Sequence, residues 1–315
     1  MRRCLFCYQP LEDARSDFHG TCSGKIFGTH NPPELPWSED QMLQLAEKVV
    51  KSQTTVTGVQ PKLSLHLEKL AKKDEPQRFT IVGLWGGYIL KPPTKQYKFL
   101  PELEDLTMHL AEISGIEVVP HSLIRLSSGK LSYITRRIDR IKETKIHMED
   151  MCQLTERLTE QKYNGSHEQI GKAIIKYSTN PGLDIINFFE QVVFSFLTGN
   201  ADMHLKNFSL YDRPGLGNML SPAYDLVASV LVVEGDEEDL ALTLNGKKKK
   251  LRKIDFLEAI NKFDIHARAI ENMFDKFRNA EEQWHEFIDI SFLPDDMKSS
   301  FHDLVKERIS RIYNF

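Results

Sequence analysis

The chain has 315 residues, enough for one large domain or for two lobes that share a core. Its 41 Lys and Arg stand against 45 Asp and Glu, a net charge of −4, so we expect no direct binding of DNA. No apolar run approaches the roughly 18 residues that span a bilayer. The apolar stretch after the basic start is too short for a signal peptide. We therefore expect a cytoplasmic protein with no membrane segment.

Three parts of the chain differ in composition. Residues 1–30 are rich in Cys, His and Gly, and the run Asn31-Pro32-Pro33-Glu34-Leu35-Pro36 predicts an extended linker after them, because proline fixes φ. Residues 31–137 read as a region rich in strands, and residues 138–315 read as mostly helical. The predicted fold class is α+β.

Four cysteines, three of them in the first 22 residues, are too few and too clustered for a disulfide scaffold. Two residues separate Cys4 from Cys7, and two separate His19 from Cys22, which is the ligand spacing of a structural zinc site. Zinc would stabilise a segment that is poor in apolar residues. Cysteines without metal are one alternative. A nucleic-acid-binding knuckle is another, which the few basic residues here disfavour.

In the second part, Ser38 is placed to cap a helix through about Val50. Alternating apolar residues predict strands, and a helix that ends at Gly115 interrupts them. The predicted strands cover residues 63–67, 79–82, 88–90, 118–124 and 131–136, and the predicted helix covers 102–114.

The clearest element of the third part is a strongly apolar helix over residues 184–197, and a helix with so wide an apolar face is normally buried. It stops at Gly199, where a polar loop begins and continues to residue 208. Short strands are expected at 208–211 and 223–225, with helices from about residue 254.

The polar loop contains Asp202 and Asn207, which have the spacing found in the catalytic loop of protein kinases. There the aspartate accepts the proton of an attacking hydroxyl, and the asparagine oxygen ligates Mg²⁺. Asp225 is placed to supply a second oxygen ligand. The alternative is that Asp202 and Asn207 merely form turns, as both residue types often do. The buried helix before the loop and Asp225 after it favour the catalytic interpretation.

Two further side chains of the loop have alternative roles. Lys206 could contact the transferring phosphate as a catalytic residue, or it could be a solvated surface lysine. His204 is better read as a structural loop residue than as a base.

A kinase also needs a lysine on a strand for the ATP phosphates, paired with a glutamate on a helix. Lys91 ends a predicted strand, and Glu104 on the next helix is its natural partner, with Glu102 as the competitor. The loop at residues 54–62 should cover the phosphates. It has a single glycine, so the G-x-G-x-x-G pattern is absent, and it is rich in hydroxyl groups.

Several motifs, in order over about residues 50–230, resemble the HipA/HipT-like serine/threonine kinase toxins of bacterial toxin–antitoxin systems. They are Gly58-Val59-Gln60-Pro61-Lys62-Leu63, Ile89-Leu90-Lys91-Pro92, Pro101-Glu102-Leu103-Glu104, Met108-His109-Leu110-Ala111, Arg136-Arg137-Ile138-Asp139-Arg140, His147-Met148-Glu149-Asp150, the Asp202 loop and Ala223-Tyr224-Asp225. The resemblance implies a two-lobed kinase-like fold with a sheet-rich N-lobe and a mostly helical C-lobe.

The resemblance also implies roles for individual residues. ATP binding falls to Gly58, Gln60, Lys62, Lys91 and Glu104. Asp202 is implied as the base, and Asn207 and Asp225 as the ligands of Mg²⁺. The loop before Gly58 is implied to be autophosphorylated, at Thr55 or Thr57.

Partners follow from the same resemblance. The chain is more similar to the short HipT-like type, in which a small N-terminal subdomain is a separate protein. A HipS-like small protein and a HipB-like DNA-binding antitoxin are therefore expected partners, and an aminoacyl-tRNA synthetase is the expected class of substrate. Two alternatives stay open at this stage: a small-molecule kinase of the aminoglycoside type, and a catalytically silent subunit of a repressor complex.

Overall fold

The computed structural model describes residues 2–13, 15–42, 44–45, 62–68, 77–82, 86–141, 144–235 and 237–313. The chain divides into two units. The first contains Met1–Asp105, Val119–Thr144 and Ile290–Phe292, and the second contains Leu106–Val118, Lys145–Asp289 and Leu293–Phe315. Four residues that were assigned to the phosphate loop, Thr55, Thr57, Gly58 and Gln60, lie outside the described residues.

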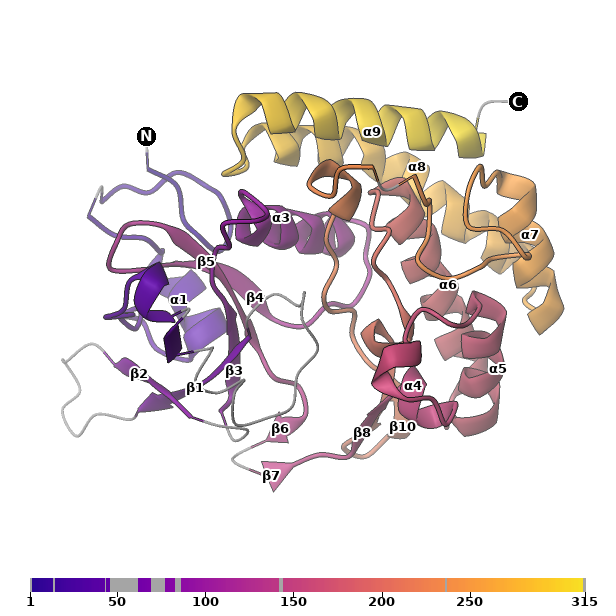
Figure 1. The fold of residues 1–315 in the computed structure, drawn as a ribbon, viewed down its shortest axis with the longest axis horizontal. Coiled ribbons are helices and arrows are strands. Elements are labelled where there is room, and N and C mark those ends of the chain that lie inside the picture. Colours follow the sequence, from indigo (N-terminus) through magenta and orange to yellow (C-terminus); the bar gives the residue numbers. More distant parts are fainter. Residues whose placement is uncertain are drawn as a thin grey trace. The chain divides into compact units, whose positions relative to one another are not determined.

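The first unit is built on a five-stranded sheet with the order β2-β1-β3-β5-β4, in which every neighbouring pair is antiparallel (Figure 1). Its strands are β1 (Leu63–Glu68), β2 (Arg78–Ile81), β3 (Tyr88–Lys91), β4 (His121–Arg125) and β5 (Leu131–Arg136). All five predicted strands of this region are confirmed within a few residues, because alternation of apolar side chains is a strong signal for a half-buried sheet. The register places Lys91 opposite Tyr133.

The N-terminal segment belongs to this unit and contains helix α1 (Gly20–Phe27), which ends at Gly28 with a φ of 73°. The segment is poor in apolar residues, but several of those it has are buried in this unit. Leu5, Tyr8 and Ile26 are fully buried, and the Phe27 ring packs edge-on against Phe79 of β2. Apolar contact with the sheet therefore contributes to holding the segment in place.

Ser38 begins a helix, as predicted, and the predicted end near Val50 lies outside the described residues. Its hydroxyl accepts a hydrogen bond from the Gln41 amide at 3.4 Å, and the Gln41 side chain accepts one from the Ser38 amide at 2.9 Å, which is a reciprocal cap. The predicted helix at 102–114 is also confirmed as α3 (Leu100–Ile113), and it is followed by Gly115 at a φ of 71°.

The second unit is mostly helical and has the strongly apolar helix α6 at its core. Phe188, Phe189 and Phe196 of α6 are fully buried, as the width of its apolar face predicted. The helices described in this unit, besides the end of α3, are α4 (Met151–Leu154), α5 (His167–Tyr177), α6 (Pro181–Leu197), α7 (Lys253–Ile260), α8 (Ala267–Asp289) and α9 (Asp295–Tyr313), with short 3₁₀ turns at Thr159–Gln161, Leu205–Asn207, Ser229–Leu231 and Asn261–Phe263.

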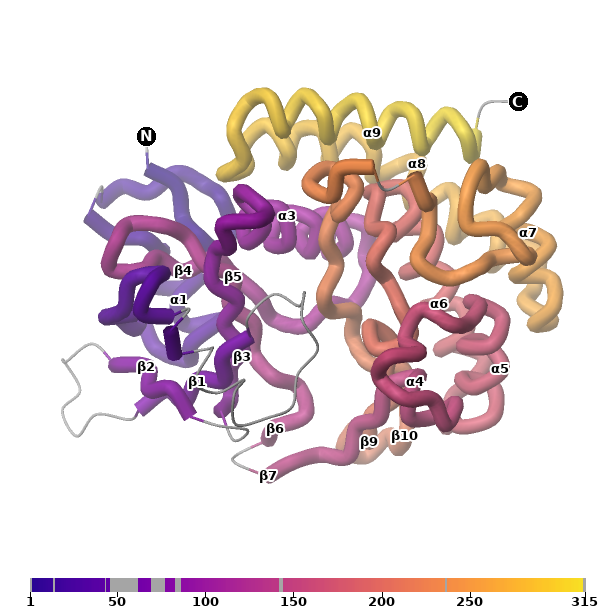
Figure 2. Tube along the Cα trace, viewed as in Figure 1, coloured from indigo at the N-terminus to yellow at the C-terminus, as the bar shows by residue number. Residues whose placement is uncertain are grey.

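A small antiparallel sheet of order β10-β9-β8 accompanies these helices, and Figure 2 traces the path of the chain through β9 and β10. Its strands are β8 (Met148–Asp150), β9 (Ser209–Arg213) and β10 (Gly217–Leu220). Two further strands of two residues each, β6 (Arg140–Ile141) and β7 (Thr144–Lys145), pair with each other as a separate sheet, and β6 belongs to the first unit. The strand predicted at 223–225 was wrong. Ala223 makes an isolated bridge to Val118, and Asp225 has a left-handed φ of 56°, which no strand continues through.

The lysine run at 247–250 follows a turn at Asn245 and Gly246, both of which have a left-handed φ. Lys247 pairs with Asp255 at 2.6 Å, Lys248 with Glu238 at 3.2 Å and Lys249 with Glu237 at 3.0 Å.

In the described part of the chain, no helix is both long and apolar enough to cross a bilayer.

Candidate active site

The polar loop after α6 begins with a tight reversal at Gly199, whose φ is 69°. A Cβ at this position would lie 2.5 Å from Val230 Cγ2 and 2.6 Å from Leu304 Cδ2. Both the backbone angle and the close packing therefore require glycine here. The reversal directs the loop from the buried helix toward the surface.

Short hydrogen bonds hold the loop in shape. The Ala201 amide donates to the Ser229 hydroxyl at 2.9 Å, and the His204 amide donates to the Asp202 carbonyl at 2.9 Å. The Asn207 amide in turn donates to the His204 carbonyl at 2.9 Å, within the 3₁₀ turn Leu205–Asn207. Asp202 and Asn207 thus lie on one loop that hydrogen bonds hold together, which suits side chains that must hold reactants in a set geometry.

Asp202 is exposed, whereas its neighbours Ala201 and Met203 are buried. One of its carboxylate oxygens accepts a hydrogen bond from the Tyr163 hydroxyl at 2.6 Å. The Asp202 carboxylate thus already accepts a hydrogen bond from a hydroxyl group. Sequence reasoning missed Tyr163, because it comes 39 residues before Asp202 and belongs to no motif around the loop.

Asn207 and Asp225 are the candidate metal ligands. Asn207 is 5% exposed, and its Oδ1 is buried without a hydrogen-bond partner among the described residues. An unpaired amide oxygen in the interior is costly, and a bound cation would satisfy it. Carbonyl and carboxylate oxygens are also the ligands that Mg²⁺ prefers. The residues present therefore fit a magnesium ion.

The backbone around Asp225 is unusual. Its φ of 56° is uncommon for a residue other than glycine and is typical of strained functional positions. The neighbouring Tyr224 hydroxyl lies 2.5 Å from the Ser209 hydroxyl and donates to the Lys206 carbonyl at 3.0 Å. Tyr224 thus ties the Asp225 segment to the loop that carries Asn207.

Lys206 is partly exposed and its ammonium group pairs with Asp150 at 2.6 Å. Asp150 also caps helix α4 by accepting a hydrogen bond from the Gln153 amide at 3.0 Å. The catalytic role of Lys206 stays a prediction. Asp150, from the His147-Met148-Glu149-Asp150 motif, is the residue that positions its side chain.

Burial lowers the pKa of His204 to about 4, so its imidazole is neutral at physiological pH and a weak base. Its ring packs edge-on against Tyr163, with 5.1 Å between the centroids. These contacts agree with the structural role expected for His204 and leave Asp202 as the candidate base.

In the first unit, Lys91 forms a buried ion pair with Glu104, and its ammonium group lies 5.2 Å from the centroid of the Tyr133 ring. Glu104, and not Glu102, is therefore the glutamate that faces the strand lysine. Lys62 is exposed and directly precedes β1. Contact of Lys91 and Lys62 with ATP remains a prediction.

Glu102, which does not pair with Lys91, has a raised pKa. Burial, together with the nearby charge of Asp105, raises its pKa from 4.5 to about 7. The folded protein therefore holds an extra proton between about pH 4.5 and 7, and stability falls as pH rises through that window. We expect Glu102→Gln to stabilise the fold by about 1–2 kcal/mol at pH 8, with the gain lost near pH 4.5.

Urea unfolding of both proteins at several pH values measures this gain. Glu282→Gln, on the exposed face of α8, is the matched control. This variant should have nearly the same free energy of unfolding as the parent protein at every pH. A constant difference between Glu102→Gln and the parent protein across the pH range would contradict the prediction.

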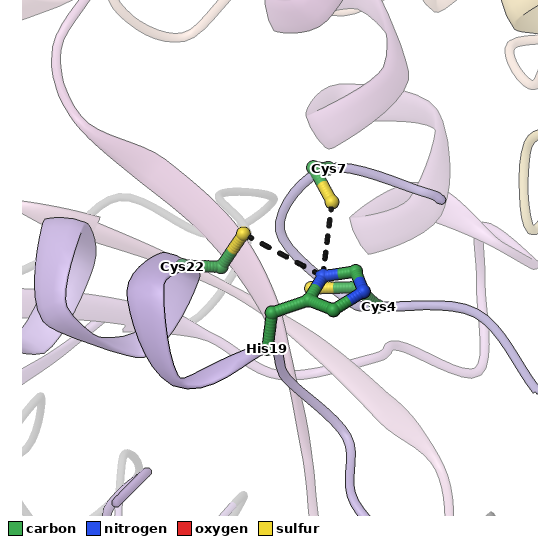
Figure 3. A group of neighbouring side chains, drawn as sticks. All are labelled: Cys4, Cys7, His19 and Cys22. Carbon is green, nitrogen blue, oxygen red and sulfur yellow. Dashed lines mark hydrogen bonds between the residues drawn. The ribbon is translucent and has the colours of Figure 1, made fainter. Parts of the chain in front are cut away.

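The four predicted zinc ligands, Cys4, Cys7, His19 and Cys22, converge in the first unit (Figure 3). Their ligand atoms all lie within 4.8 Å of one another, and every cysteine is a free thiol. A hydrogen bond from Cys7 lowers the pKa of Cys4 to about 4, while the pKa of Cys7 rises.

The first unit has an antiparallel sheet with the buried Lys91–Glu104 pair, and the second unit is mostly helical and contains the Asp202 loop. These features define the protein-kinase-like α+β fold. A model of the HipA-like C-terminal domain matches residues 54–284. The chain therefore belongs to the family of proteins with a HipA-like C-terminal domain.

Several relatives carry names of kinases. A protein of Sinorhizobium fredii named as kinase Y4dM is 35% identical over 208 residues, which are 62% of this chain and 49% of that protein. A protein of Haemophilus influenzae named as a kinase is 29% identical over 72% of this chain and 68% of its own length. The serine/threonine-protein kinase toxin HipA of Shewanella oneidensis is 28% identical over 62% of this chain and 48% of that toxin. The chain thus spans about half the length of the first of these relatives.

Two solved structures resemble the fold. HipA from the Shewanella oneidensis complex with HipB and operator DNA has a TM-score of 0.68 at 20% identity, covering 89% of this chain and 72% of that one. The Helicobacter pylori proinflammatory kinase CtkA has a TM-score of 0.52 at 17% identity, covering 71% and 87%. At these identities the likeness establishes the fold.

Proposed function

We propose that the chain is an ATP- and Mg²⁺-dependent serine/threonine protein kinase that acts in the cytoplasm as the toxin of a toxin–antitoxin module. The observation that carries the proposal is the loop after α6. It presents an exposed carboxylate at Asp202 and, five residues later, a buried amide oxygen at Asn207 without a described partner. These are the two oxygens that a phosphoryl-transfer loop needs, one for a hydroxyl and one for a metal ion.

The proposed mechanism assigns each side chain a task. Asp202 orients the acceptor hydroxyl and takes its proton, from the position where Tyr163 now donates a hydrogen bond. Asn207 and Asp225 hold Mg²⁺, which when bound neutralises charge on the phosphates of ATP. Lys91, held by Glu104, orients those phosphates. Most of the rate then comes from positioning and electrostatic stabilisation, since phosphoryl transfer asks little covalent chemistry of the protein.

The resemblance to the family supports a proposal for regulation and partners. Autophosphorylation at Thr55 or Thr57 would add roughly −1.5 to −2 charges beside the ATP phosphates and so inhibit the kinase. A HipB-like antitoxin is the proposed DNA-binding partner, in line with the HipA, HipB and operator DNA complex of Shewanella oneidensis. A HipS-like protein is proposed as a further partner, and an aminoacyl-tRNA synthetase as the substrate. The net charge of −4 favours contact with DNA through the antitoxin.

Phosphate transfer from labelled ATP tests the proposal. The purified full chain is incubated with Mg²⁺ and labelled ATP, alone, with cell extract, and with aminoglycosides, and labelled residues are mapped by mass spectrometry. We expect label on Thr55 or Thr57 and on a protein of the extract. The Asp202→Asn variant, prepared in parallel, reports any contaminating kinase.

Each outcome decides between classes of function. Label that appears on aminoglycosides and on no protein would replace the proposal with a small-molecule kinase. A folded and unphosphorylated sample that binds no ATP and labels nothing would replace it with a silent subunit of a repressor complex. Label on proteins with Thr55 and Thr57 unmodified would retain the kinase and reject the autoregulation.

A further inference from the structure

The N-terminal cluster of Cys4, Cys7, His19 and Cys22 serves no step of the proposed kinase mechanism. Two of its ligands lie on a tight turn, in which the Cys4 amide donates to the Gln9 carbonyl and the Tyr8 amide donates to the Cys4 carbonyl, each at 2.9 Å. The other two lie at the start of helix α1, with His19 as its N-cap and Cys22 one turn along. Two separate backbone elements thus each present two ligands to one point (Figure 3).

Hydrogen bonding sets the tautomer of His19. Its Nε2 lies 3.0 Å from the Pro10 carbonyl oxygen, which can only accept, so Nε2 carries the proton. The lone pair of Nδ1 therefore faces the sulfurs of Cys7 and Cys22, at 3.5 and 3.8 Å. Metal-binding histidines are oriented in the same manner, with the second ring nitrogen donating to a carbonyl or carboxylate.

The spacing of the ligand atoms matches a single tetrahedral ion. Bonds of about 2.3 Å to sulfur and about 2.0 Å to nitrogen place ligand atoms roughly 3.5–3.8 Å apart, and the His19 contacts have these lengths. A binuclear iron–sulfur cluster spreads its four ligands over two irons and needs a wider site than one with all atoms within 4.8 Å. Three thiolates and an imidazole select zinc among the single ions.

The residues between and beside the ligands attach the segment to the rest of the first unit. The Leu5 carbonyl accepts hydrogen bonds from the Leu123 amide at 3.2 Å and the Ser122 hydroxyl at 3.0 Å, both on β4. The hydroxyl of Tyr8, next to Cys7, donates to Asp105 at 2.8 Å. Tyr8 has a φ of 61°, a left-handed conformation that its surroundings must hold in place.

From these observations we propose that Cys4, Cys7, His19 and Cys22 bind one Zn²⁺ ion as a closed structural site. The ion joins the turn at residues 4–7 to the start of α1 and so anchors the N-terminal segment on β4. A site with four protein ligands leaves no open position for catalysis, so its contribution is to stability. The proposal does not depend on kinase activity.

Metal content of the full chain tests the site directly. Protein purified under reducing conditions should contain about one zinc ion per chain, and titration of its thiols with an organomercurial should release that zinc. Cobalt exchanged into the site should give the intense visible bands of a tetrahedral thiolate complex. Because these measurements use the unaltered protein, they do not depend on a variant that folds.

Variants then assign the ligands. His19→Ala should lose most of the zinc, whereas His19→Cys, which restores a fourth ligand, should retain it. The matched controls are His30→Ala, an exposed histidine of the same segment, and Cys152→Ser, a buried cysteine of the second unit, and both should keep a full complement. Removal of zinc should raise hydrogen exchange at the Leu123 amide about tenfold or more, since its acceptor Leu5 is released.

Three results would overturn the proposal. The first is a folded, reduced protein that takes up less than about a tenth of an equivalent of zinc, even with zinc supplied. The second is iron in place of zinc, with the visible absorption of an iron–sulfur cluster. The third is full zinc retention by His19→Ala, which would place the ion elsewhere.

Discussion

Asp202→Asn is expected to lower the rate of phosphoryl transfer by about 10²–10⁴-fold while leaving the affinity for ATP within a fewfold of the parent protein. The carboxylate is exposed and already accepts a hydrogen bond from the Tyr163 hydroxyl at 2.6 Å, so it is free of the buried ion pairs that hold the fold together. An amide keeps the size of the side chain and removes the basic oxygen. The loss should therefore fall on kcat, measured by single-turnover transfer from labelled ATP.

Asp212→Asn supplies the matched control for this variant. Asp212 is an exposed aspartate on β9, a few residues beyond the loop. Its backbone amide donates a hydrogen bond to the His147 carbonyl, which the substitution leaves in place. Its activity should equal that of the parent protein. Equal kcat values for Asp202→Asn and the parent would exclude Asp202 as the base, and an equal loss in both variants would point to a general effect of charge.

Asn207→Ala should separate activity from stability. The Asn207 Oδ1 is buried without a partner among the described residues, so removing it breaks no hydrogen bond of that oxygen, and the melting temperature should stay close to that of the parent protein. If this oxygen is a ligand of Mg²⁺, the variant should need about 10–100 times more Mg²⁺ for half-maximal transfer. A magnesium titration of the transfer rate, run beside a thermal melt, measures both quantities.

Asn218→Ala should show the opposite pattern. The side-chain amide of Asn218 on β10 donates a hydrogen bond to the Tyr177 carbonyl at 2.9 Å. Loss of this hydrogen bond should cost about 1 kcal/mol of stability and leave the magnesium titration unchanged. Two outcomes would count against the assignment of Asn207: an unaltered magnesium requirement, or a large loss of stability that shows a structural role for its oxygen.

The local features of the candidate site were predictable from the sequence. The apolar face of α6, the stop at Gly199 and the spacing of Asp202 and Asn207 all lie within about 25 residues, where periodicity and turn chemistry are strong signals. The proposed zinc ligands are equally local, since each pair sits within one turn or one helix start. The left-handed Asp225 shows the limit of such signals. Its apolar neighbours predicted a strand, and the backbone turns there instead.

Other features depend on contacts between distant segments. Whether Glu102 or Glu104 faces Lys91 depends on the rotation of α3 about its axis relative to β3, and both glutamates lie within the same turn. Neither the Tyr163 hydrogen bond to Asp202 nor the Asp150 pairing with Lys206 leaves any local pattern, at separations of 39 and 56 residues.

The sequence by itself determined which chemical groups this protein has and in what order: a carboxylate and an amide on one loop, a lysine on a strand, and three thiols with an imidazole near the start. The tertiary structure alone decided their partners and their burial. It left Asn207 Oδ1 without a described partner, raised the pKa of Glu102 to about 7, and directed His19 Nδ1 toward the sulfurs. The physical reason is that burial and hydrogen-bond geometry arise from packing between segments far apart in the chain, which spacing and periodicity do not encode.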